Sequence, residues 1–485
     1  MVFQTFREEP KILPFQFKRL HNNQVLLVNE SGDFTFISND DFDKFRMYKL
    51  DNKEVYDKLF SHCFLTTEDN FDLSLRQLSA RYVSRKAFLR EFTTLHMMVI
   101  TLRCNQQCEY CQVACAEENA SQFDMSVETA KKIIDCIFES PTQYPKIEFQ
   151  GGEPTLNWKV LSYSVLYAEQ KAKEKKKNVD FVICTNLVNI TEEQLCFCKE
   201  HNVSISTSLD GNKMIHDTCR KMKNGHGTYE KFVKKLKLAR EIVGQNSVNA
   251  LMTTTSYNLD KLKDIIDEYI FLGFKGIFIR ALNPYGFAAE KISKLGYDIE
   301  EFVKNYFKAL DYIIEINKKI YFKEYFSSLL LSRILTPFST GFVDLQSPSG
   351  AGICGSIYDY DGSVYPADEA RMLARMGDNY FKLGNVNENT YDEIFLGKKL
   401  KNIIANSCVE ICNPCAWCCF QSYCGCDPVR NYLEKGNIYR NMSNSSFCIK
   451  HKKIIEGLFE RLNRNDSYIN KVFWSWVTSN PSLVN

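Results

Sequence analysis

Short apolar runs alternate with amphipathic stretches between residues 95 and 280. The runs are rich in β-branched and aromatic residues and have the length of buried strands. Ser126 and the pair Thr191 and Gln194 stand where helices between these runs should begin, and such residues favour helix N-termini. The pattern predicts repeated βα units and a parallel sheet. The expected strands are 95–102, 146–150, 179–184, 203–207, 247–253 and 276–279, with helices that include 158–173, 229–243 and 259–272.

Polar or glycine-rich residues follow the end of each expected strand. In a βα barrel the loops after the strands converge on one face, where catalytic groups collect. The sequence therefore predicts an α/β protein with a partial (βα)6 TIM-like barrel that carries its active site at the strand ends. The residues after the second and fourth strands are Gly151, Gly152, Glu153, Ser208 and Asp210.

The N-terminal region follows a different pattern. Apolar residues at 13–17, 25–29 and 34–37, separated by polar turns, predict a small antiparallel meander, with helices after it. Such a sheet could bind a peptide at its edge, or it could simply cap the barrel. We expect a small α+β domain at 1–93, the barrel at 94–300, a helical bridge at 301–345, a cysteine-rich domain at 346–450 and a helical tail at 451–485.

Composition narrows the choice of partners. The chain has 45% apolar and 25% charged residues, which is typical of a soluble globular protein. A formal net charge of +2 gives no electrostatic argument for nucleic acid or for an anionic membrane surface. The sequence shows neither the apolar core of a signal peptide nor a membrane span. We therefore expect a cytoplasmic protein without nucleic-acid or membrane partners, whose 19 cysteines stay reduced.

Three cysteines crowd the loop after the first expected barrel strand, namely Cys104, Cys108 and Cys111. Three thiolates bind an iron-sulfur cluster with one iron left open, whereas four close a cluster or a zinc site. The open iron is where chemistry can take place. Spacing alone leaves a second interpretation, a structural zinc knuckle with Cys115 as the fourth ligand.

The Cys-x3-Cys-x2-Cys spacing, with Tyr110 before the last cysteine, resembles the signature of the radical S-adenosylmethionine (SAM) enzymes. The resemblance implies a [4Fe-4S] cluster that binds SAM at its open iron and reduces it to a 5′-deoxyadenosyl radical. The run from Gly151 to Pro154 is similar to the family motif for the SAM amino group. It implies SAM contacts for Gly151, Gly152 and Glu153.

The same resemblance implies that Ser208 and Asp210 contact the SAM carboxylate or ribose, and that Arg220 pairs with the carboxylate. Each residue also has an ordinary structural interpretation. Asp-Gly is a common turn dipeptide, so Ser208 and Asp210 could only turn the chain. Arg220 could form a surface ion pair.

A second group of cysteines lies near the C-terminus. Its spacing resembles the SPASM extension of radical SAM enzymes and implies one closed auxiliary [4Fe-4S] cluster. A zinc ribbon with four cysteines is the alternative. The four positions are Cys415, Cys418, Cys424 and Cys448.

Two ligands of the second auxiliary cluster typical of SPASM proteins are missing. Ala367 and Pro428 stand at those positions. We therefore expect that this cluster is lost and that Cys354, which fits a third position, is buried. The alternative is that Cys354 recruits off-pattern thiols such as Cys412, Cys419 or Cys426.

Asp368 directly follows the altered position at Ala367. In sulfatase-activating relatives an aspartate at this place is a candidate base near the substrate. Oxidation of a substrate radical requires proton removal, so a carboxylate has a use there. The alternative is an exposed turn acid or a helix cap.

Several segments together resemble the His-Xaa-Ser system radical SAM maturases. They are Leu-Pro-Phe-x-Phe from residue 13, Leu-Leu-Val-Asn-Glu-Ser-Gly-Asp from 26 and Tyr-Pro-Ala-Asp-Glu-Ala-Arg-Met from 365. The resemblance implies hydrogen abstraction from a ribosomally made precursor peptide, an oxidative side-chain cross-link, and an electron donor such as flavodoxin or ferredoxin. The alternatives are formylglycine formation on a sulfatase and a non-enzymatic zinc or electron-carrier protein.

Overall fold

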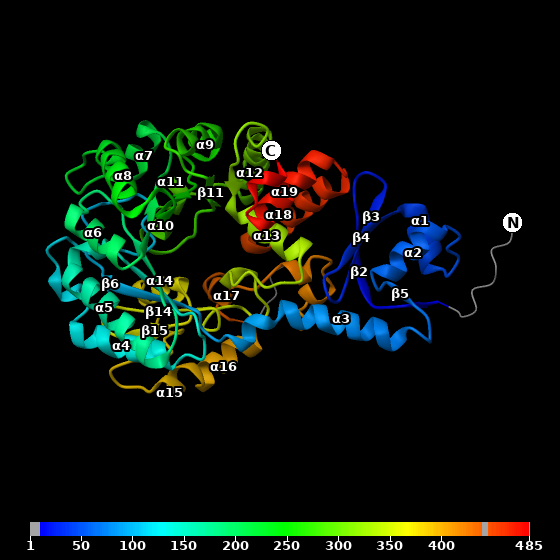
Figure 1. Ribbon diagram of the computed structural model, residues 1–485, viewed down its shortest axis with the longest axis horizontal. Coiled ribbons are helices and arrows are strands. Elements are labelled where there is room, and N and C mark those ends of the chain that lie inside the picture. Colours follow the sequence, from blue (N-terminus) through cyan, green and yellow to red (C-terminus); the bar gives the residue numbers. More distant parts are fainter. Residues whose placement is uncertain (1–9, 439–444, 485) are drawn as a thin grey trace.

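The computed structural model describes residues 10–438 and 445–484. Figure 1 shows a barrel region in cyan and green, joined to a small blue N-terminal domain by the long helix α3 (Phe71–Arg85). The N-terminal domain contains the predicted antiparallel meander, which is confirmed. Its elements are β2 (Phe15–Arg19), β3 (Gln24–Asn29) and β4 (Phe34–Ser38), with α1 (Asn39–Arg46), α2 (Lys53–Ser61) and the short pair β1 (Lys11–Ile12) and β5 (Leu65–Thr66).

A nine-stranded sheet forms the centre of the described structure, in the order β12-β10-β9-β8-β7-β6-β14-β15-β16. The barrel strands β6 to β10 and β12 pair in parallel, as predicted. The last predicted strand, 276–279, is instead split between β11 (Gly276–Ile277) and β12, because β11 pairs with β13 (Lys323–Glu324). The barrel strands are β6 (Leu95–Thr101), β7 (Lys146–Gly151), β8 (Asp180–Cys184), β9 (Val203–Ser208), β10 (Val248–Thr253) and β12 (Ile279–Arg280).

Helices connect the barrel strands, and the starts predicted at Ser126 and Thr191 are confirmed, whereas the helix predicted from residue 259 begins at Leu262 after a 3-10 turn. The hydroxyl of Ser126 accepts the amide of Thr129, and Thr191 and Gln194 form a reciprocal capping box. The helices are α4 (Val127–Glu139), α5 (Trp158–Lys175), α6 (Glu192–Glu200), α7 (Lys213–Cys219), α8 (Tyr229–Val243) and α9 (Leu262–Phe271).

Side chains alternate between the two faces of the barrel strands. On β7, Ile147 and Phe149 are fully buried in the apolar core, whereas Glu148 and Gln150 line an internal cavity. A register slip by one residue would exchange these faces, so apolar burial determines which polar groups point inward. The inner face is therefore available for binding and chemistry.

The second half of the chain extends the sheet and packs beside it. Strand β14 (Gly355–Tyr358) pairs in parallel with β6, and β15 (Ser363–Tyr365) and β16 (Gly384–Asn385) continue as antiparallel strands. Helix α18 runs across residue 450, where the sequence pattern placed a domain boundary. The helices are α10 (Gly286–Glu290), α11 (Ile292–Leu295), α12 (Ile299–Ile316), α13 (Tyr325–Leu335), α14 (Asp368–Arg375), α15 (Tyr391–Phe395), α16 (Lys398–Ala405), α17 (Pro428–Lys435), α18 (Ser446–Asn463) and α19 (Ser467–Thr478).

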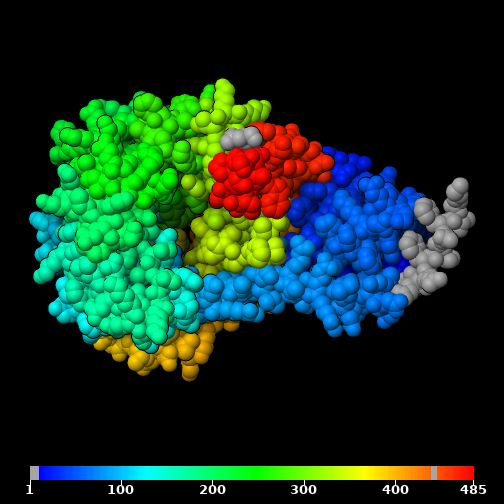
Figure 2. All heavy atoms as spheres, in the orientation of Figure 1, coloured from blue at the N-terminus to red at the C-terminus, as the bar shows by residue number. Residues whose placement is uncertain are grey.

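The C-terminal helix α18 packs against the N-terminal domain, where the ring centroids of Phe459 and Phe34 lie 5.0 Å apart. Figure 2 shows α18 and α19 in red between the blue N-terminal domain and the barrel region. Arg85 at the end of α3 is buried and donates hydrogen bonds to the carbonyls of Ser31 and Arg333, at 2.5 and 2.8 Å.

In the part of the chain that the structure describes, no helix has the length and apolar composition of a membrane span.

Candidate active site

A cavity of about 260 Å³ lies at the C-terminal ends of the barrel strands. The loops after β6, β7, β8 and β9 all contribute to its wall, as expected for a βα barrel. Glu153, Asp210 and the four C-terminal cysteines of the SPASM-like spacing are not among its lining residues. The predicted site residues that do line it are Cys104, Cys108, Cys111, Gly151, Gly152, Ser208, Arg220 and Asp368.

The cysteine loop is anchored at its base by an arginine and an aspartate. Nε and Nη2 of Arg103 donate to the carboxylate of Asp124 at 2.8 and 2.7 Å. The hydroxyl of Thr101 donates to the same carboxylate at 2.6 Å. A bidentate guanidinium pair restricts direction as well as distance, so the start of the loop is held rigidly at the end of β6.

The glycine pair after β7 lets this strand end approach the backbone of the cysteine loop. A Cβ atom at Gly151, where φ is +145°, would lie 2.0 Å from the carbonyl oxygen of Thr101. One at Gly152 would lie 2.3 Å from the carbonyl oxygen of Arg103. Only glycine fits at these contacts. The backbone of both glycines consequently forms part of the cavity wall next to the cysteines.

Glu153 connects two loops. Its buried carboxylate accepts hydrogen bonds from the amide and hydroxyl of Thr155, the hydroxyl of Thr185 and the amide of Asn186. Burial raises the pKa of this carboxyl group, while these hydrogen bonds oppose the rise. The carboxylate holds the loops after β7 and β8 together, and its contact with the SAM amino group stays a prediction.

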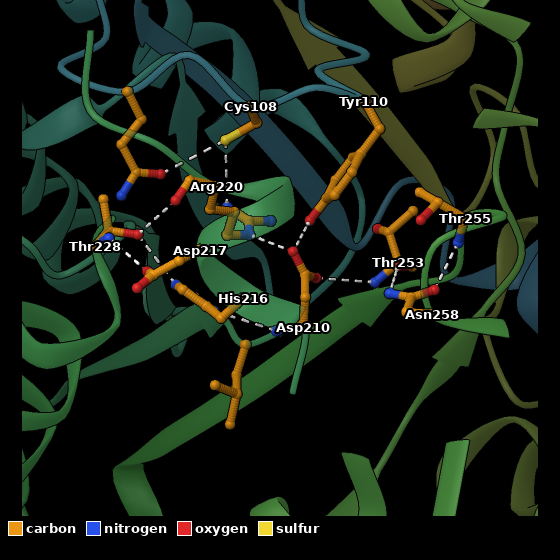
Figure 3. A network of polar contacts seen from close by, with 12 residues as sticks. Cys108, Tyr110, Asp210, His216, Asp217, Arg220, Thr228, Thr253, Thr255 and Asn258 are labelled. Atoms are coloured by element: carbon orange, nitrogen blue, oxygen red, sulfur yellow. Dashed lines mark hydrogen bonds and ion pairs between the residues drawn. The ribbon is translucent and has the colours of Figure 1, made fainter. Parts of the chain in front are cut away.

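Asp210, Tyr110 and Arg220 form a buried network beside Cys108 (Figure 3). Oδ2 of Asp210 accepts the Tyr110 hydroxyl at 2.6 Å and Nε of Arg220 at 3.0 Å. Its Oδ1 accepts the amide of Thr253 at 3.3 Å. The other end of the guanidinium, Nη1, lies 3.7 Å from Sγ of Cys108. Asp210 therefore aims Arg220 at the cysteine, and the surface ion pair considered for Arg220 is excluded.

The charge of Arg220 changes the electrostatics of the thiol. Burial raises the pKa of Cys108 to about 12, and the Arg220 guanidinium opposes this rise. A thiol must lose its proton to act as a metal ligand. The network thus places a positive charge where it favours the ligating form of Cys108.

Four thiols of the cysteine loop line the cavity. The fourth, Cys115, forms side-chain hydrogen bonds with both Cys104 and Cys111. Among residues 10–438 and 445–484, no three His, Cys, Asp or Glu side chains are grouped closely enough to hold a single metal ion. An iron-sulfur cluster distributes its ligands over several irons, so its thiols need a common space rather than a common point. The set of Cys104, Cys108 and Cys111 fits this requirement, because all three line one cavity.

Asp368 enters the same cavity from the extended part of the sheet. It is the first residue of α14, and its side chain is 21% exposed. Oδ1 lies 3.5 Å from Nε of Arg371, whose side chain is only 1% exposed. Asp368 is therefore neither a fully exposed turn acid nor the cap of this helix, since the capping position is Ala367.

The C-terminal cysteines lie on two consecutive 3-10 turns and on α18. Cys415 begins η7 (Cys415–Trp417), and Cys418 follows it. Cys424 follows η8 (Gln421–Tyr423), and Cys448 lies in the first turn of α18. Cys354 is 5% exposed, so its expected burial is confirmed. The ligand roles of the four cysteines stay predictions.

Sequence reasoning missed several polar residues that line the cavity, among them Cys184, Glu148 and Gln150. Sγ of Cys184 donates to Oε1 of Glu148 at 3.1 Å, and Nε2 of Gln150 donates to the same oxygen at 2.6 Å. The available signal was the alternation of polar residues with Ile147 and Phe149 in a strand that is otherwise apolar.

Comparisons with known proteins agree with this geometry. Residues 98–269 match the family model of the Radical SAM superfamily. A cysteine-type anaerobic sulfatase-maturating enzyme of Clostridium novyi (strain NT) is 28% identical over 370 residues, which cover 74% of this chain and 93% of that protein. The radical SAM cyclopropyl synthase TigE of Paramaledivibacter caminithermalis is 22% identical over 235 residues, which cover 45% of this chain and 48% of that protein.

Solved structures share the fold. The anSMEcpe structure with bound AdoMet has a TM-score of 0.64 at 22% identity and covers 78% of this chain and 99% of its own. Streptococcus suis SuiB, solved with its precursor peptide SuiA, has a TM-score of 0.53 at 14% identity and covers 90% of this chain and 99% of its own. The predicted α/β radical SAM barrel is confirmed. The chain carries a radical SAM enzyme domain at residues 98–269 and is similar to the SPASM-type maturases; radical SAM enzymes use a [4Fe-4S] cluster and SAM.

Proposed function

We propose that this enzyme abstracts a hydrogen atom from a ribosomally made precursor peptide and leaves an oxidative cross-link between side chains. The observation that carries the proposal is the single cavity shared by the three-cysteine loop and Asp368. Two similar proteins agree with a peptide substrate: a sulfatase-maturating enzyme acts on a protein, and SuiB was solved with a precursor peptide.

In this proposal Cys104, Cys108 and Cys111 hold the cluster. Together with SAM, the bound cluster supplies a 5′-deoxyadenosyl radical. Backbone groups of Gly151 and Gly152 and the hydroxyl of Ser208 bind SAM, since all three residues line the cavity. Glu153 and Asp210, which do not line the cavity, position neighbouring groups, and the SAM contacts expected for both stay predictions.

Glu153 maintains the loops after β7 and β8 through its four accepted hydrogen bonds. Asp210 holds Arg220 beside Cys108. Arg220 lines the cavity as well, so its guanidinium can also meet the carboxylate of SAM.

Closing a cross-link after hydrogen abstraction requires the substrate to lose one further electron and one proton. Asp368 accepts the proton, because its carboxylate lines the cavity and has no hydrogen-bond donor at its Oδ1 within the described chain. A closed auxiliary [4Fe-4S] cluster, when bound by four cysteines, would accept the electron. These ligands are Cys415, Cys418, Cys424 and Cys448.

Formylglycine formation on a sulfatase is a second candidate. The cysteine-type sulfatase-maturating enzyme of Clostridium novyi (strain NT), whose match covers 74% of this chain, favours it. Ala367 and Pro428 at two expected ligand positions of the second auxiliary cluster argue for a different reaction. A sulfatase-derived cysteine peptide and a candidate precursor peptide, sought in a short reading frame beside this gene, separate the two, since only one should be modified.

The test of radical SAM activity is anaerobic reconstitution with iron and sulfide, followed by reduction in the presence of SAM. We expect the reconstituted enzyme to bind two clusters and to release 5′-deoxyadenosine. In the cell, flavodoxin or ferredoxin in the reducing cytoplasm would donate the electron. Cys108→Ala should abolish this release, whereas Cys198→Ala, in the core of α6, should retain it. A sample with zinc but no iron that still modifies a peptide would overturn the proposal.

A further inference from the structure

A second cavity, of about 290 Å³, adjoins the cavity that the cysteine loop and Asp368 line. The two cavities share Leu251 of β10 and Arg280 of β12 as lining residues, so one begins where the other ends. The second cavity lies between these last barrel strands and the C-terminal helices α12, α13 and α18. None of the predicted cluster or SAM ligands lines it.

One wall of the second cavity consists of phenylalanine rings. Phe278, Phe326 and Phe342 contact one another, with ring centroids 5.8, 6.2 and 6.5 Å apart. Phe302 of α12 adds a fourth ring. Aromatic rings attract further rings in tilted and edge-on arrangements, beyond the gain from burying apolar area. This wall favours a flat aromatic group over a chain of the same area.

Charged groups line the same cavity. Nζ of Lys450 lies 5.7 Å from the centre of the Phe326 ring. Within the residues described, this ammonium has neither a hydrogen-bond acceptor nor an ion pair, and the carboxylate of Asp344 likewise has no hydrogen-bond donor. Lys450 and Asp344 do not form an ion pair. Their opposite charges nevertheless attract each other within the cavity.

Such an arrangement is costly unless something completes it. A half-buried charge without hydrogen bonds loses part of its hydration, and the contact of Lys450 with the Phe326 ring offsets only part of that cost. A group that accepts from Lys450 and donates to Asp344 would satisfy both residues.

We propose that the second cavity binds an aromatic side chain of the substrate peptide that both donates and accepts hydrogen bonds, which means tyrosine or histidine. Its ring packs on Phe278, Phe326 and Phe342, and its polar edge lies between Lys450 and Asp344. This inference rests on the proposed function and adds a substrate requirement to it. The modified residue then lies next to this anchor, in the adjoining cavity.

Other side chains fit the second cavity less well. Phenylalanine and leucine leave both charges unsatisfied, and the indole of tryptophan donates but does not accept. A lysine or arginine would meet Lys450 and Arg280, and an acidic side chain would meet Asp344. Phenol and imidazole alone combine a flat ring with both kinds of hydrogen bond.

The test uses four probes, the N-acetyl amides of tyrosine, histidine, phenylalanine and leucine. Their affinity for the anaerobic, cluster-loaded enzyme is measured by ligand-observed NMR titration. We expect the tyrosine or histidine probe to bind about tenfold more tightly than phenylalanine, because a hydrogen bond to a charged group distinguishes them. Lys450→Met should remove this preference. Phe342→Leu, which keeps the charges, should weaken the aromatic probes about threefold.

Lys453→Met is the matched control, because Lys453 lies on the same helix, is 45% exposed and pairs with Glu300. It should bind all probes like the wild type. Equal affinity for the four probes, an unchanged preference in Lys450→Met, or unchanged affinity of Phe342→Leu for the aromatic probes would overturn the inference. The titration needs no SAM cleavage, so it can fail while 5′-deoxyadenosine release succeeds, and the reverse.

Discussion

Arg220 and Asp210 form an ion pair in which Nε lies 3.0 Å from Oδ2. Asp210 is fully buried and the Arg220 side chain is 12% exposed, so water screens the pair little. The same guanidinium reaches Cys108, with Nη1 3.7 Å from Sγ. One aspartate outside the cavity therefore controls the charge next to a proposed cluster ligand.

Asp210→Asn tests this control. The substitution leaves the guanidinium buried without its negative partner, which costs about 3 kcal/mol of unfolding free energy. We expect a loss of that order in anaerobic denaturant unfolding, together with weaker SAM binding in a titration. Glu230→Gln is the control, because it removes an exposed pair with Lys213 and should change neither quantity. Similar losses in both variants would contradict a special role for Asp210.

Cys115→Ser separates the cluster from a zinc knuckle. Cys115 contacts Cys104 and Cys111, but the proposed cluster needs only three thiolates of this loop. The variant should retain the iron-sulfur absorption and electron paramagnetic resonance signals, whereas Cys111→Ser should lose those of the SAM-binding cluster. Equal loss of metal from both variants would support four-thiol binding.

Asp368→Asn should separate SAM cleavage from product formation. An amide cannot accept the proton, so we expect peptide product to fall about a hundredfold, while 5′-deoxyadenosine release continues. Mass spectrometry of the peptide and chromatography of the nucleoside measure the two quantities. Asp361→Asn is the control, since the side chain of Asp361 accepts hydrogen bonds from Ser363 in a turn. Loss of nucleoside release in Asp368→Asn would argue against its role as the base.

The C-terminal cysteines predict the iron content. Cys448→Ala should remove the auxiliary cluster and halve the iron bound per chain, because two clusters of equal size are expected. Cys354→Ala, at a buried position beside Phe88 and Ile353, should bind as much iron as the wild type. A loss of iron in Cys354→Ala would show that Cys354 ligates a further cluster.

Because of His96, we expect the folded protein to be less stable in acid. Burial lowers its pKa from 6.5 to about 3, and its ring contacts the Tyr358 hydroxyl and the Thr93 carbonyl. Between pH 6.5 and pH 3 the unfolded chain binds a proton at His96 and the folded chain does not. The free energy of unfolding therefore decreases as the pH is lowered. His96 should account for about 2 kcal/mol of loss from pH 7 to pH 5. His96→Gln should reduce the pH dependence of denaturant unfolding by this amount. Identical pH profiles would refute the assignment.

Much of the fold was predictable because its signals are local. The cap of α4 needs only Ser126 and Thr129, and strand β7 shows its buried face in Ile147 and Phe149. The split of the last strand was not predictable. It depends on β13, which starts at Lys323 and pairs with β11 almost fifty residues earlier in the chain.

The sequence by itself determined the chemistry at hand: a three-cysteine loop, a glycine pair and barrel strands in order, all of which depend on neighbours along the chain. Only the tertiary structure decided the partners of these groups. In the tertiary structure Glu153 accepts a hydrogen bond from Thr185, and Asp210 forms an ion pair with Arg220. Lys450 and Arg280 line the same cavity. Such contacts join residues that are distant in the sequence, and they depend on how whole elements pack, which no local pattern encodes.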